Sequence, residues 1–487
     1  MKNQNRMPIF EALIKHRNSR PTSFHVPGHK YGVLLQHRPE EENYFKDVLK
    51  IDATEITGLD DLHSPDGIIQ EAEELLAELY QVKKSFFLIN GSTVGNLAMI
   101  MAACEQDDLI LVQRNCHKSV LNALNLAKVR PVFLDPDFVH HWKIASGVSL
   151  DTVEQAFSRF PSAKAIILTY PNYYGLVSDL KEISKLAHLY NIPVLVDEAH
   201  GSHLIVGEPF PASAIQCGAD VVVQSAHKTL PAMTMGSYMH VNSDLVSIDK
   251  IREYLQMFQS SSPSYPIMAS LDLARHYLSS YKKADCDFLN KEIARFKKEL
   301  AVIPSIEVLD FPSKIGDLLK ITIQSKSGLS GFELQKLLEK EGIYTELADS
   351  YNVLFIFPLL KENHVYPIDE TIMKIKRVLA DIKIEHVREE MVMTIDTRIS
   401  ELAIPFSEMA KYETKEVPID EAEGKVCAET IIPYPPGIPL LQRGEQITEE
   451  KIIHLNRLVG GGSRFHGGLL LDKGLLKVFI ETTAFGG

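Results

Sequence analysis

The chain has 487 residues, of which 45% are hydrophobic and 24% charged, and its formal net charge is −13. This length allows about two to four domains, and the acidic balance argues against nucleic acid as a main partner. The five cysteines are scattered and never form a C-x-x-C pair, which excludes a disulfide framework and a zinc knuckle and favours a reducing compartment. The chain start lacks the long apolar core of a signal peptide, and no stretch approaches about 18 uninterrupted apolar residues. We therefore expect a cytoplasmic protein without a membrane partner.

The first 70 residues contain FHVPGHK and GLDDLHSPDG and have too few periodic apolar positions for a core of their own. We expect residues 1–70 to form an N-terminal arm that packs on another part of the protein. From about residue 75, short β-rich runs alternate with helical runs, and Pro, Asn, Asp or Gly bounds most of them. This alternation predicts a large α/β domain over 71–280, in which helices cover a parallel sheet. Its expected strands lie within 108–113, 131–135, 163–171, 192–200 and 219–228.

The pattern changes after about residue 275, where the long charged helix LNKEIARFKKEL precedes a strand (LLKITIQS), a helix and another strand (VLFIFP). Ser330 with Glu333 forms a capping box and predicts a helix over 331–341. These elements indicate a small α+β domain over 281–392. The Pro-rich segment IIPYPPGIPLL (431–441) is typical of neither earlier region, and we expect a C-terminal α+β domain over 393–487.

Two neighbouring predicted strands end in reactive side chains. VLVDEAHG places Asp197 at one strand end, and SAHKT places Lys228 after the next. A carboxylate there can keep a pyridine nitrogen protonated, and a lysine can form an imine with a cofactor aldehyde. Upstream, Ser92 and Thr93 lie in NGSTVGN, where a strand leads into a helix whose N–H groups could bind phosphate. Each motif alone is a weak indication, because strand-end lysines are usually solvated and Asp197 could merely cap a helix.

Two other interpretations fail on spacing. DEAH matches the carboxylate box of a helicase, but a helicase needs a phosphate loop, and Val222 and His227 stand where its glycines are required. Four histidines could suggest a metal site, yet no carboxylate spacing supports one, and we expect no metal: His140, His141, His200 and His203.

Several segments together resemble the pyridoxal-phosphate-dependent ornithine/lysine/arginine decarboxylase family, in its short bacterial form without an amino-terminal wing domain. They are FHVPGHK, GLDDLH, NGSTVGN, RNCHKS, VLVDEAHG, QSAHKTLPAMT, SSSPSYPIMASLD and YPPGIPLL, and the match spans about residues 20 to 445. The resemblance implies the fold-type-I, aminotransferase-like architecture, pyridoxal 5′-phosphate as cofactor, and a homodimer or higher homo-oligomer with shared active sites. It also implies decarboxylation of arginine, lysine or ornithine.

The resemblance assigns the cofactor contacts residue by residue. Lys228 would carry the Schiff base, Asp197 would bind the pyridine nitrogen, and His117 and Ala199 would lie on opposite faces of the ring. The phosphate would be bound by Ser92, Thr93, Ser225 and His227, and by Ser261 or Ser262 across the dimer interface.

Substrate residues are also implied. His29, Asp61 and His63 would shape the site from the other subunit, and Glu445 would bind the distal cation of the substrate. Lys228, His200 or His227 would donate the proton to Cα after CO2 leaves. Arg443 stands where the family usually has proline, and we expect this extra cation to alter substrate preference.

Three alternatives stay open at this point. Transamination or β-elimination would use the same fold, although between 300 and 385 only Arg377 could clamp a substrate carboxylate in the way many aminotransferases do. A cofactor-binding transcription regulator would need a basic DNA-binding module, and neither terminus supplies one. A non-catalytic paralogue is disfavoured by the intact Asp197 and Lys228.

Overall fold

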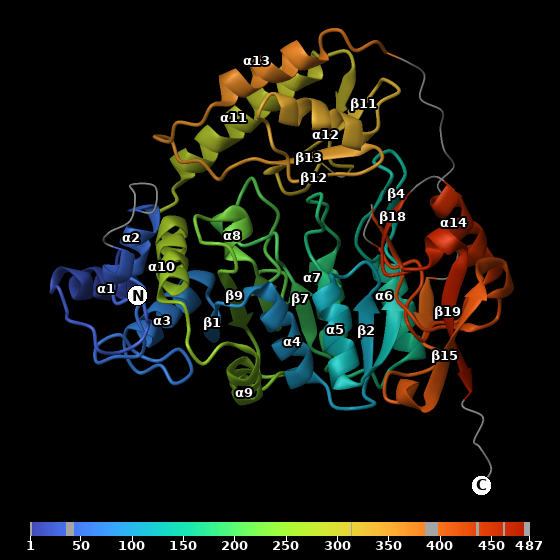
Figure 1. Ribbon diagram of the computed structural model, residues 1–487, viewed down its shortest axis with the longest axis horizontal. Coiled ribbons are helices and arrows are strands. Elements are labelled where there is room, and N and C mark those ends of the chain that lie inside the picture. Colours follow the sequence, from blue (N-terminus) through green and yellow to red (C-terminus); the bar gives the residue numbers. More distant parts are fainter. Residues whose placement is uncertain are drawn as a thin grey trace. The chain divides into compact units, whose positions relative to one another are not determined.

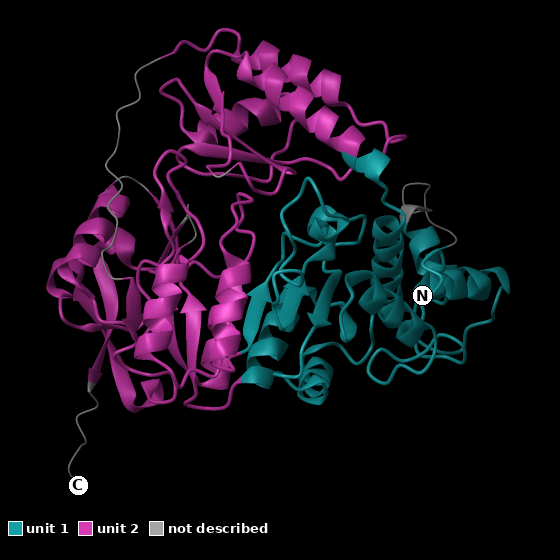
Figure 2. Cartoon of the chain, turned by 180° about the vertical axis from the view of Figure 1, so that it is seen from behind, with its two compact units in different colours: residues 1–103, 193–286 teal, residues 104–192, 287–487 magenta. Residues whose placement is uncertain are grey.

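A computed structural model describes the chain at residues 2–35, 43–312, 314–384, 398–434, 438–460 and 463–481. It divides into two compact units (Figure 2). Unit 1 contains Met1–Ala103 and Pro193–Cys286, and unit 2 contains Cys104–Ile192 and Asp287–Gly487. Each unit takes in segments that are distant in the sequence, and the boundaries of the four segments expected from the sequence stay predictions.

Unit 1 contains four neighbouring strands in the order β1 (Lys84–Leu88), β9 (Ser237–Val241), β8 (Val221–Gln224) and β7 (Val194–Asp197) (Figure 1). β7 and β8 are parallel, with Asp197 opposite Val223, whereas β9 runs antiparallel to β8 and β1. β7 and β8 are buried along their whole length, as expected for continuous apolar strands covered on both faces. Their carboxyl ends therefore meet at one edge of the sheet.

Helix α4 (Gly91–Ala103) follows β1 and packs closely on the sheet. Gly91 has φ +80°, a left-handed conformation that favours glycine at the turn into the helix. A Cβ at Gly95 would lie 2.7 Å from Cγ1 of Val223, so only glycine allows this helix to approach β8 so closely. The helices of unit 1 that follow β8 in the sequence are α8 (Ala226–Thr229), α9 (Ile248–Phe258) and α10 (Tyr265–Ser279).

The N-terminal segment packs on unit 1 through α1 (Pro8–Asn18), which contacts α3 (Ile68–Tyr80) and α10. Ile9 and Leu13 are buried in this contact, and the Ile9 N–H donates to Asp272 at 3.0 Å. Between α1 and α3 lie the short helices η1 (Val33–Leu35) and α2 (Asn43–Leu49). Two apolar residues one helical turn apart thus attach a segment that has no core of its own.

Unit 2 contains β6 (Ala165–Thr169), β2 (Leu109–Gln113), β3 (Arg130–Leu134) and β14 (Ile399–Glu401) in that order. β6, β2 and β3 are parallel, and β14 is antiparallel to β3. The connections carry α5 (Lys118–Ala127), α6 (Leu150–Arg159), α7 (Leu180–Leu189) and the hairpin of β4 (Phe138–Val139) with β5 (Ile144–Ala145).

Unit 2 also contains an antiparallel four-stranded sheet in the order β10 (Ile306–Val308), β11 (Lys320–Ser325), β13 (Asn352–Ile356) and β12 (Leu347–Ala348). Its helices are α11 (Lys283–Ala301), α12 (Gly331–Lys340) and α13 (Ile368–Leu379). The predicted capping box is confirmed: the Glu333 N–H donates to the Ser330 hydroxyl, and the Glu333 carboxylate accepts from the Ser330 N–H.

The C-terminal part of unit 2 has a core of its own around Ile431, Leu455 and Val478. Here β15 (Tyr412–Pro418), β19 (Leu475–Glu481) and β16 (Val426–Cys427) form an antiparallel sheet beside the pair β17 (Ile432–Tyr434) and β18 (Arg464–His466). This part also contains α14 (Glu449–Gly460) and the single-turn helices η4 (Met409–Lys411), η5 (Ile419–Glu421) and η6 (Leu471–Lys473), while η3 (Leu204–Val206) lies in unit 1.

As expected from the sequence, β2 is parallel to β3 and β6, and β7 is parallel to β8; β9 and β14, which the sequence analysis did not name, are antiparallel to their neighbours and make the sheet mixed. A parallel connection needs a dozen or more residues, usually with a full helix. The 12 residues between β8 and β9 contain the four-residue helix α8 instead of a full crossover helix, and β9 returns antiparallel to β8. Among the described residues, no helix is long and apolar enough to span a bilayer.

Candidate active site

The site is built at the carboxyl ends of β7 and β8 in unit 1. Asp197 is the last residue of β7, and the Glu198 N–H donates to the Val223 carbonyl of β8 at 2.8 Å. Just beyond β8, Lys228 lies in α8, and its Nζ is 3.0 Å from Nε2 of His200. The structure thus brings together His200 and Lys228, which the sequence placed at two separate strand ends.

The carboxylate of Asp197 is 2% exposed and is oriented by two N–H donors. Its Oδ2 accepts from the Asn96 side-chain amide at 2.8 Å, and its Oδ1 accepts from the Ala199 N–H at 3.1 Å. A buried carboxylate requires such donors to offset the loss of water. The sequence analysis did not single out Asn96, although it lies in the quoted NGSTVGN segment, one helical turn after Ser92 on α4.

The N-terminus of α4 presents the groups that a phosphate needs. Gly91 begins the helix, so the first N–H groups of the helix have no acceptor within it. The Ser225 hydroxyl donates to the Ser92 hydroxyl at 2.8 Å, which places β8 and α4 side by side at this point. Ser225 is buried, while Thr93 is exposed. Together with Asp197 and Lys228, this set of donors fits pyridoxal phosphate.

His227 is tied to the backbone rather than directed by another side chain. Its Nδ1 lies 3.1 Å from the Gly236 carbonyl, which can only accept, so Nδ1 carries a proton. In the neutral ring, Nε2 is then an acceptor. His227 can donate to a phosphate through Nε2 only when the imidazole is protonated.

His117 belongs to unit 2 and caps the N-terminus of α5. Its Nδ1 accepts from the Ser119 N–H at 3.2 Å, so Nε2 carries the proton when the ring is neutral. The side chain is exposed. A helix N-terminus therefore fixes the orientation of the imidazole that was predicted to lie on the ring face.

The predicted substrate residues of the N-terminal segment are half-buried and take part in local hydrogen bonds. Asp61 Oδ1 accepts from the His63 N–H at 2.8 Å, and His63 Nε2 donates to the Ser260 carbonyl at 2.9 Å. His29 Nε2 lies 3.1 Å from Asp52 Oδ2. The segment 58–67 is thus attached to the SSSPSY segment, in which Ser261 and Ser262 are exposed.

Asp60, beside Asp61, has a structural role. Its Oδ2 accepts from the N–H groups of Gly67 and Ile69 at 2.9 and 2.8 Å and so closes the start of α3. Burial raises the pKa of Asp60, but the backbone donors outweigh it and hold the pKa below its ordinary value. Of Asp60 and Asp61, only Asp61 remains a candidate for binding the substrate.

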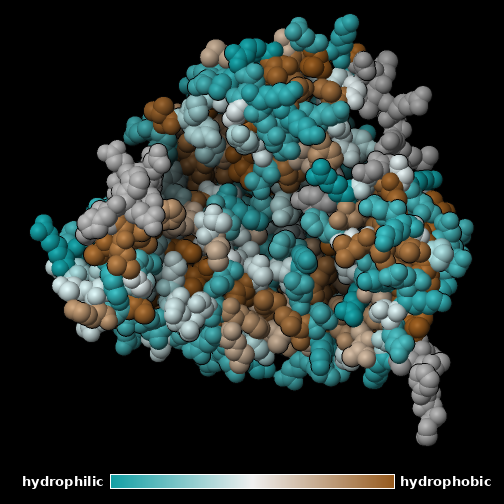
Figure 3. All heavy atoms as spheres, viewed as in Figure 1, coloured by the Kyte–Doolittle hydropathy of each residue, from teal (hydrophilic) through white to brown (hydrophobic). Residues whose placement is uncertain are grey.

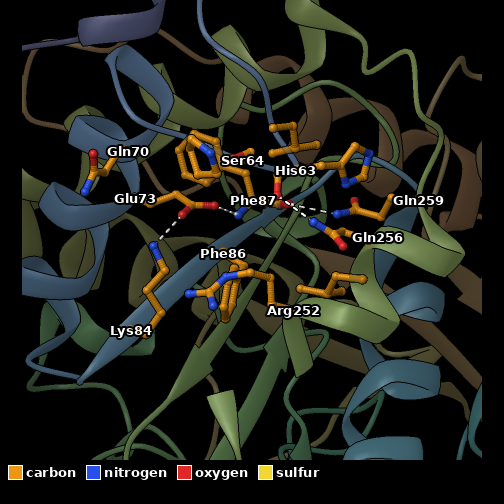
Figure 4. A pocket seen from close by; sticks show the side chains of 13 residues that line it. His63, Ser64, Gln70, Glu73, Lys84, Phe86, Phe87, Arg252, Gln256 and Gln259 are labelled. Carbon is orange, nitrogen blue, oxygen red and sulfur yellow. Dashed lines mark hydrogen bonds and ion pairs between the residues drawn. The ribbon is translucent and has the colours of Figure 1, made fainter. Parts of the chain in front are cut away.

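His63 also lines a cavity of about 390 Å³ between α3, β1 and α9 (Figure 4). Figure 4 shows the buried Glu73 paired with Lys84 at 2.6 Å on one side, and Gln256 donating to the His63 carbonyl at 2.8 Å on the other. None of the predicted cofactor residues lines this cavity. It is therefore separate from the strand-end site.

Glu445 lies in a buried ion cluster of unit 2. It is 3% exposed, and its carboxylate accepts from both terminal nitrogens of Arg114 at 2.9 and 2.6 Å. Lys451 Nζ lies 2.7 Å from Oε1. Burial raises the pKa of Glu445, but the two cations outweigh it and lower the pKa to about 2. The carboxylate predicted to bind a substrate cation is thus already paired with two cations of its own chain.

Arg114 completes this cluster, and the sequence analysis missed it. Besides Glu445 it donates to the carbonyls of Pro439 and Leu440 and to the Ser400 hydroxyl. Arg443, the departure from the family pattern, lies with its guanidinium 5.5 Å from the Phe479 ring centroid. Throughout the described ranges, no group of three His, Cys, Asp or Glu side chains could hold a metal ion.

Comparisons with known proteins identify the family of the chain. The family model "Orn/Lys/Arg decarboxylase, major domain" matches residues 7–314, and "Orn/Lys/Arg decarboxylase, C-terminal domain" matches residues 385–467. "Uncharacterized protein YaaO" of Bacillus subtilis (strain 168) is 45% identical, with 97% of this chain and 98% of that protein covered. Arginine decarboxylase of the same organism is 34% identical, with 95% of this chain and 96% of that protein covered. The structure of E. coli constitutive lysine decarboxylase shares the fold, with a TM-score of 0.77, 22% identity, and 98% and 82% of the two chains covered.

Proposed function

Because the chain belongs to the Orn/Lys/Arg decarboxylase family and is a pyridoxal-phosphate-dependent decarboxylase of basic amino acids, we propose that its substrate is arginine. One observation carries this proposal. The chain is 34% identical to an arginine decarboxylase of Bacillus subtilis, with 95% of this chain covered, against 24% to the constitutive lysine decarboxylase of Escherichia coli, with 91% covered. The products would be CO2 and agmatine, the amine left when arginine loses its carboxylate.

Pyridoxal phosphate, when bound, supplies an aldehyde that takes up an amine and a ring that accepts the electron pair left as CO2 departs. We infer that Lys228 is the amine of the protein and that Asp197 holds a proton at the ring nitrogen. The two N–H donors to Asp197, from Asn96 and Ala199, hold its carboxylate oxygens in a fixed orientation for that task. The hydroxyls of Ser92, Thr93 and Ser225 and the first turn of α4 would bind the phosphate.

Proton transfer is assigned to the pair of Lys228 and His200. With 3.0 Å between Nζ and Nε2, an imidazole without a proton at Nε2 can accept one from the lysine ammonium. That transfer leaves the lysine amine neutral, as bond formation requires. His200 is 3% exposed, so it exchanges protons with neighbouring groups more readily than with bulk water. Nε2 of His200 would donate a proton to Cα of the substrate after CO2 leaves.

For the distal guanidinium of the substrate we propose Asp61, since a carboxylate is the natural partner of a guanidinium. Asp61 is half-buried and its Oδ1 also orients His63. Glu445 remains an alternative only if it gives up one of its own cations. An Asp61→Asn variant should raise KM for arginine at least tenfold and leave thermal unfolding unchanged. An unchanged KM would refute the role of Asp61.

We further propose that the chain works as a homo-oligomer whose N-terminal arm is covered by another subunit. Apolar side chains of the arm are strongly exposed: Phe24 at 94%, Leu34 at 70% and Phe45 at 69%. Brown spheres gather over the arm at the left of Figure 3. Exposed apolar side chains that gather into a contiguous patch usually mark an interface. His29, Asp61, Ser261 and Ser262 would then reach the site of the other subunit.

The substrate is tested by incubating the holoenzyme with arginine, lysine and ornithine while CO2 and the product amine are measured. We expect kcat/KM for arginine to exceed that for the other two at least tenfold. Preference for lysine or ornithine would refute arginine and leave the family chemistry intact. Formation of a keto acid instead of CO2 would show that the reaction is transamination.

A further inference from the structure

Four buried polar side chains form a row across the sheet of unit 1. Glu198 follows β7, Gln224 ends β8, His240 lies in β9 and Ser85 lies in β1, and all four are 0% exposed. Such a row in the interior of a sheet is costly unless every group finds a partner. The function proposed above uses none of these residues.

The row is continuously hydrogen-bonded. Gln224 Nε2 donates to Glu198 Oε2 at 2.6 Å, and His240 Nε2 donates to Gln224 Oε1 at 3.2 Å. The Ser85 hydroxyl lies 2.8 Å from His240 Nδ1, to which it donates when the imidazole is neutral. Burial lowers the pKa of His240 to about 3, in agreement with a neutral ring. The far oxygen of Glu198 accepts from the Ala214 N–H at 2.6 Å.

Glu198 also contacts the segment that carries His200. It follows Asp197 directly, and a Cβ placed on Gly201 would lie 2.5 Å from its Cγ. The glycine therefore leaves room for the Glu198 side chain under the turn after His200. The Glu198 carboxylate is also hydrogen-bonded to Gln224, the last residue of β8. Ser225 and Lys228 follow directly after this strand.

Tyr80 connects the row to the same turn a second time. Its ring stacks on His240 with centroids 4.2 Å apart, and its hydroxyl donates to the Ser202 carbonyl at 2.6 Å. Both ends of the turn 198–202 are thus held by the row. Because interiors are close-packed, a displacement of Glu198 has to move this turn.

We propose that Glu198 is a positioning residue, which sets the placement of Asp197, His200 and Lys228 by contacting Gly201 and Gln224. The inference rests on the roles given to these three residues above. Burial raises the pKa of Glu198 to about 8, so this carboxyl takes up a proton more readily than an ordinary glutamate. A neutral carboxyl keeps the row bonded if the Gln224 amide turns over and His240 changes tautomer. Glu198→Gln should therefore preserve the placement of Asp197, His200 and Lys228, whereas Glu198→Ala should disturb it.

The test compares Glu198→Ala and Glu198→Gln with Asp220→Ala as matched control. Asp220 is a buried carboxylate, 1% exposed, at the opposite ends of the same two strands, where it accepts from the Val194 N–H at 2.7 Å. Three quantities are measured without substrate: the dissociation constant of pyridoxal phosphate, the pH midpoint of the visible absorption band of the lysine-bound cofactor, and Tm.

Both alanine variants should lose Tm, because each leaves a buried N–H without its acceptor. Only Glu198→Ala should also weaken cofactor binding, by at least tenfold, and shift the pH midpoint by half a unit or more. Glu198→Gln should keep cofactor binding within twofold of the wild type. If Glu198→Ala and Asp220→Ala change Tm alike and leave binding and midpoint unchanged, Glu198 is merely structural and the proposal is wrong.

Gln224→Met provides a second variant, which keeps the side-chain length and removes the two hydrogen bonds through which Gln224 links Glu198 to His240. It should shift the pH midpoint in the same direction as Glu198→Ala, and an unchanged midpoint would overturn the proposal even if Glu198→Ala fails to fold. Because no measurement uses substrate, a failure here is distinct from an error about arginine, which the CO2 assay alone decides.

Discussion

Replacing Glu445 by glutamine separates a structural role from a substrate role for this carboxylate. The change keeps the side-chain shape and removes one negative charge from between Arg114 and Lys451, which are both 6% exposed. The two buried cations then lose their main counter-ion. The remaining carboxylate near Arg114 is Asp135, 3.7 Å from Nε.

The expected cost follows from this burial. Removing one partner of a buried ion pair typically destabilises a protein by about 3–5 kcal/mol, because it leaves a charge buried and uncompensated. Burial raises the pKa of Asp135 to about 6, and Glu445 contributes to that rise. Without Glu445, Asp135 ionises more easily and takes over part of the role. We therefore expect the lower end, about 3 kcal/mol.

The assay is thermal and urea unfolding of the holoenzyme, with Glu401→Gln as control. Glu401 pairs with Arg159 at 3.3 Å in the same unit, but the two side chains are 40% and 59% exposed. Exposed pairs contribute about 0–1 kcal/mol, so this control should unfold like the wild type. KM for arginine should stay within twofold in both variants.

The pKa of Glu445 determines how its contribution to folding stability changes with pH. The folded-state pKa of Glu445, about 2, lies below the ordinary 4.5, so its contribution is complete above about pH 4.5 and is lost as the pH falls towards 2. The stability difference between wild type and Glu445→Gln should be constant above about pH 6, where Asp135 is ionised in both proteins, and should shrink below about 4.5 as Glu445 takes up its proton. A large rise in KM with unchanged unfolding would refute this reasoning and restore Glu445 as a substrate residue.

Three further outcomes are expected. Lys228→Ala should abolish the visible absorption band that pyridoxal phosphate gives with the wild type, and a retained band would place the Schiff base elsewhere. Gly95→Ala should cost about 1–3 kcal/mol by overpacking, since its Cβ would lie 2.7 Å from a methyl group of β8, whereas Gly460→Ala, with no atom within 4 Å, should be neutral. The double variant Phe24→Ser, Phe45→Ser should lower the oligomeric mass in light scattering if another subunit covers the arm, and an unchanged mass would contradict that interface.

The strands and helices around the site could be predicted because their patterns are local. Continuous apolar runs that end in polar residues predicted β7 and β8, and the capping box predicted the start of α12. The contact of His200 with Lys228 follows once the two strands are known to be parallel neighbours. The direction of β9 was not predictable from its own residues, because it depends on the short connection after β8.

The role of Glu445 could not be predicted because its partners are distant in the sequence. Arg114 lies 331 residues earlier, at the end of β2, and nothing in its local sequence indicates a buried cation. The hydrogen-bonded row from Glu198 to Ser85 could not be predicted for the same reason, since each of its members lies in or next to a different strand. Sequence motifs show which residues are present at a strand end, whereas pairing across a sheet decides whether they remain available to a ligand.

The candidate carboxylates therefore differ in what they can bind. Glu445 would have to give up Arg114 or Lys451 before it could take a substrate cation, and Glu198 is enclosed by Gln224 and the Ala214 N–H. Asp61 is half-buried and accepts from the His63 N–H, and no described cation forms an ion pair with it, so under the proposed function it would bind a substrate guanidinium without giving up a cation of its own chain. Discrimination among basic amino acids should accordingly depend on the 58–67 segment more than on the C-terminal core. Exchange of that segment between relatives with different substrates is then expected to move specificity, while exchange of residues around Glu445 moves stability.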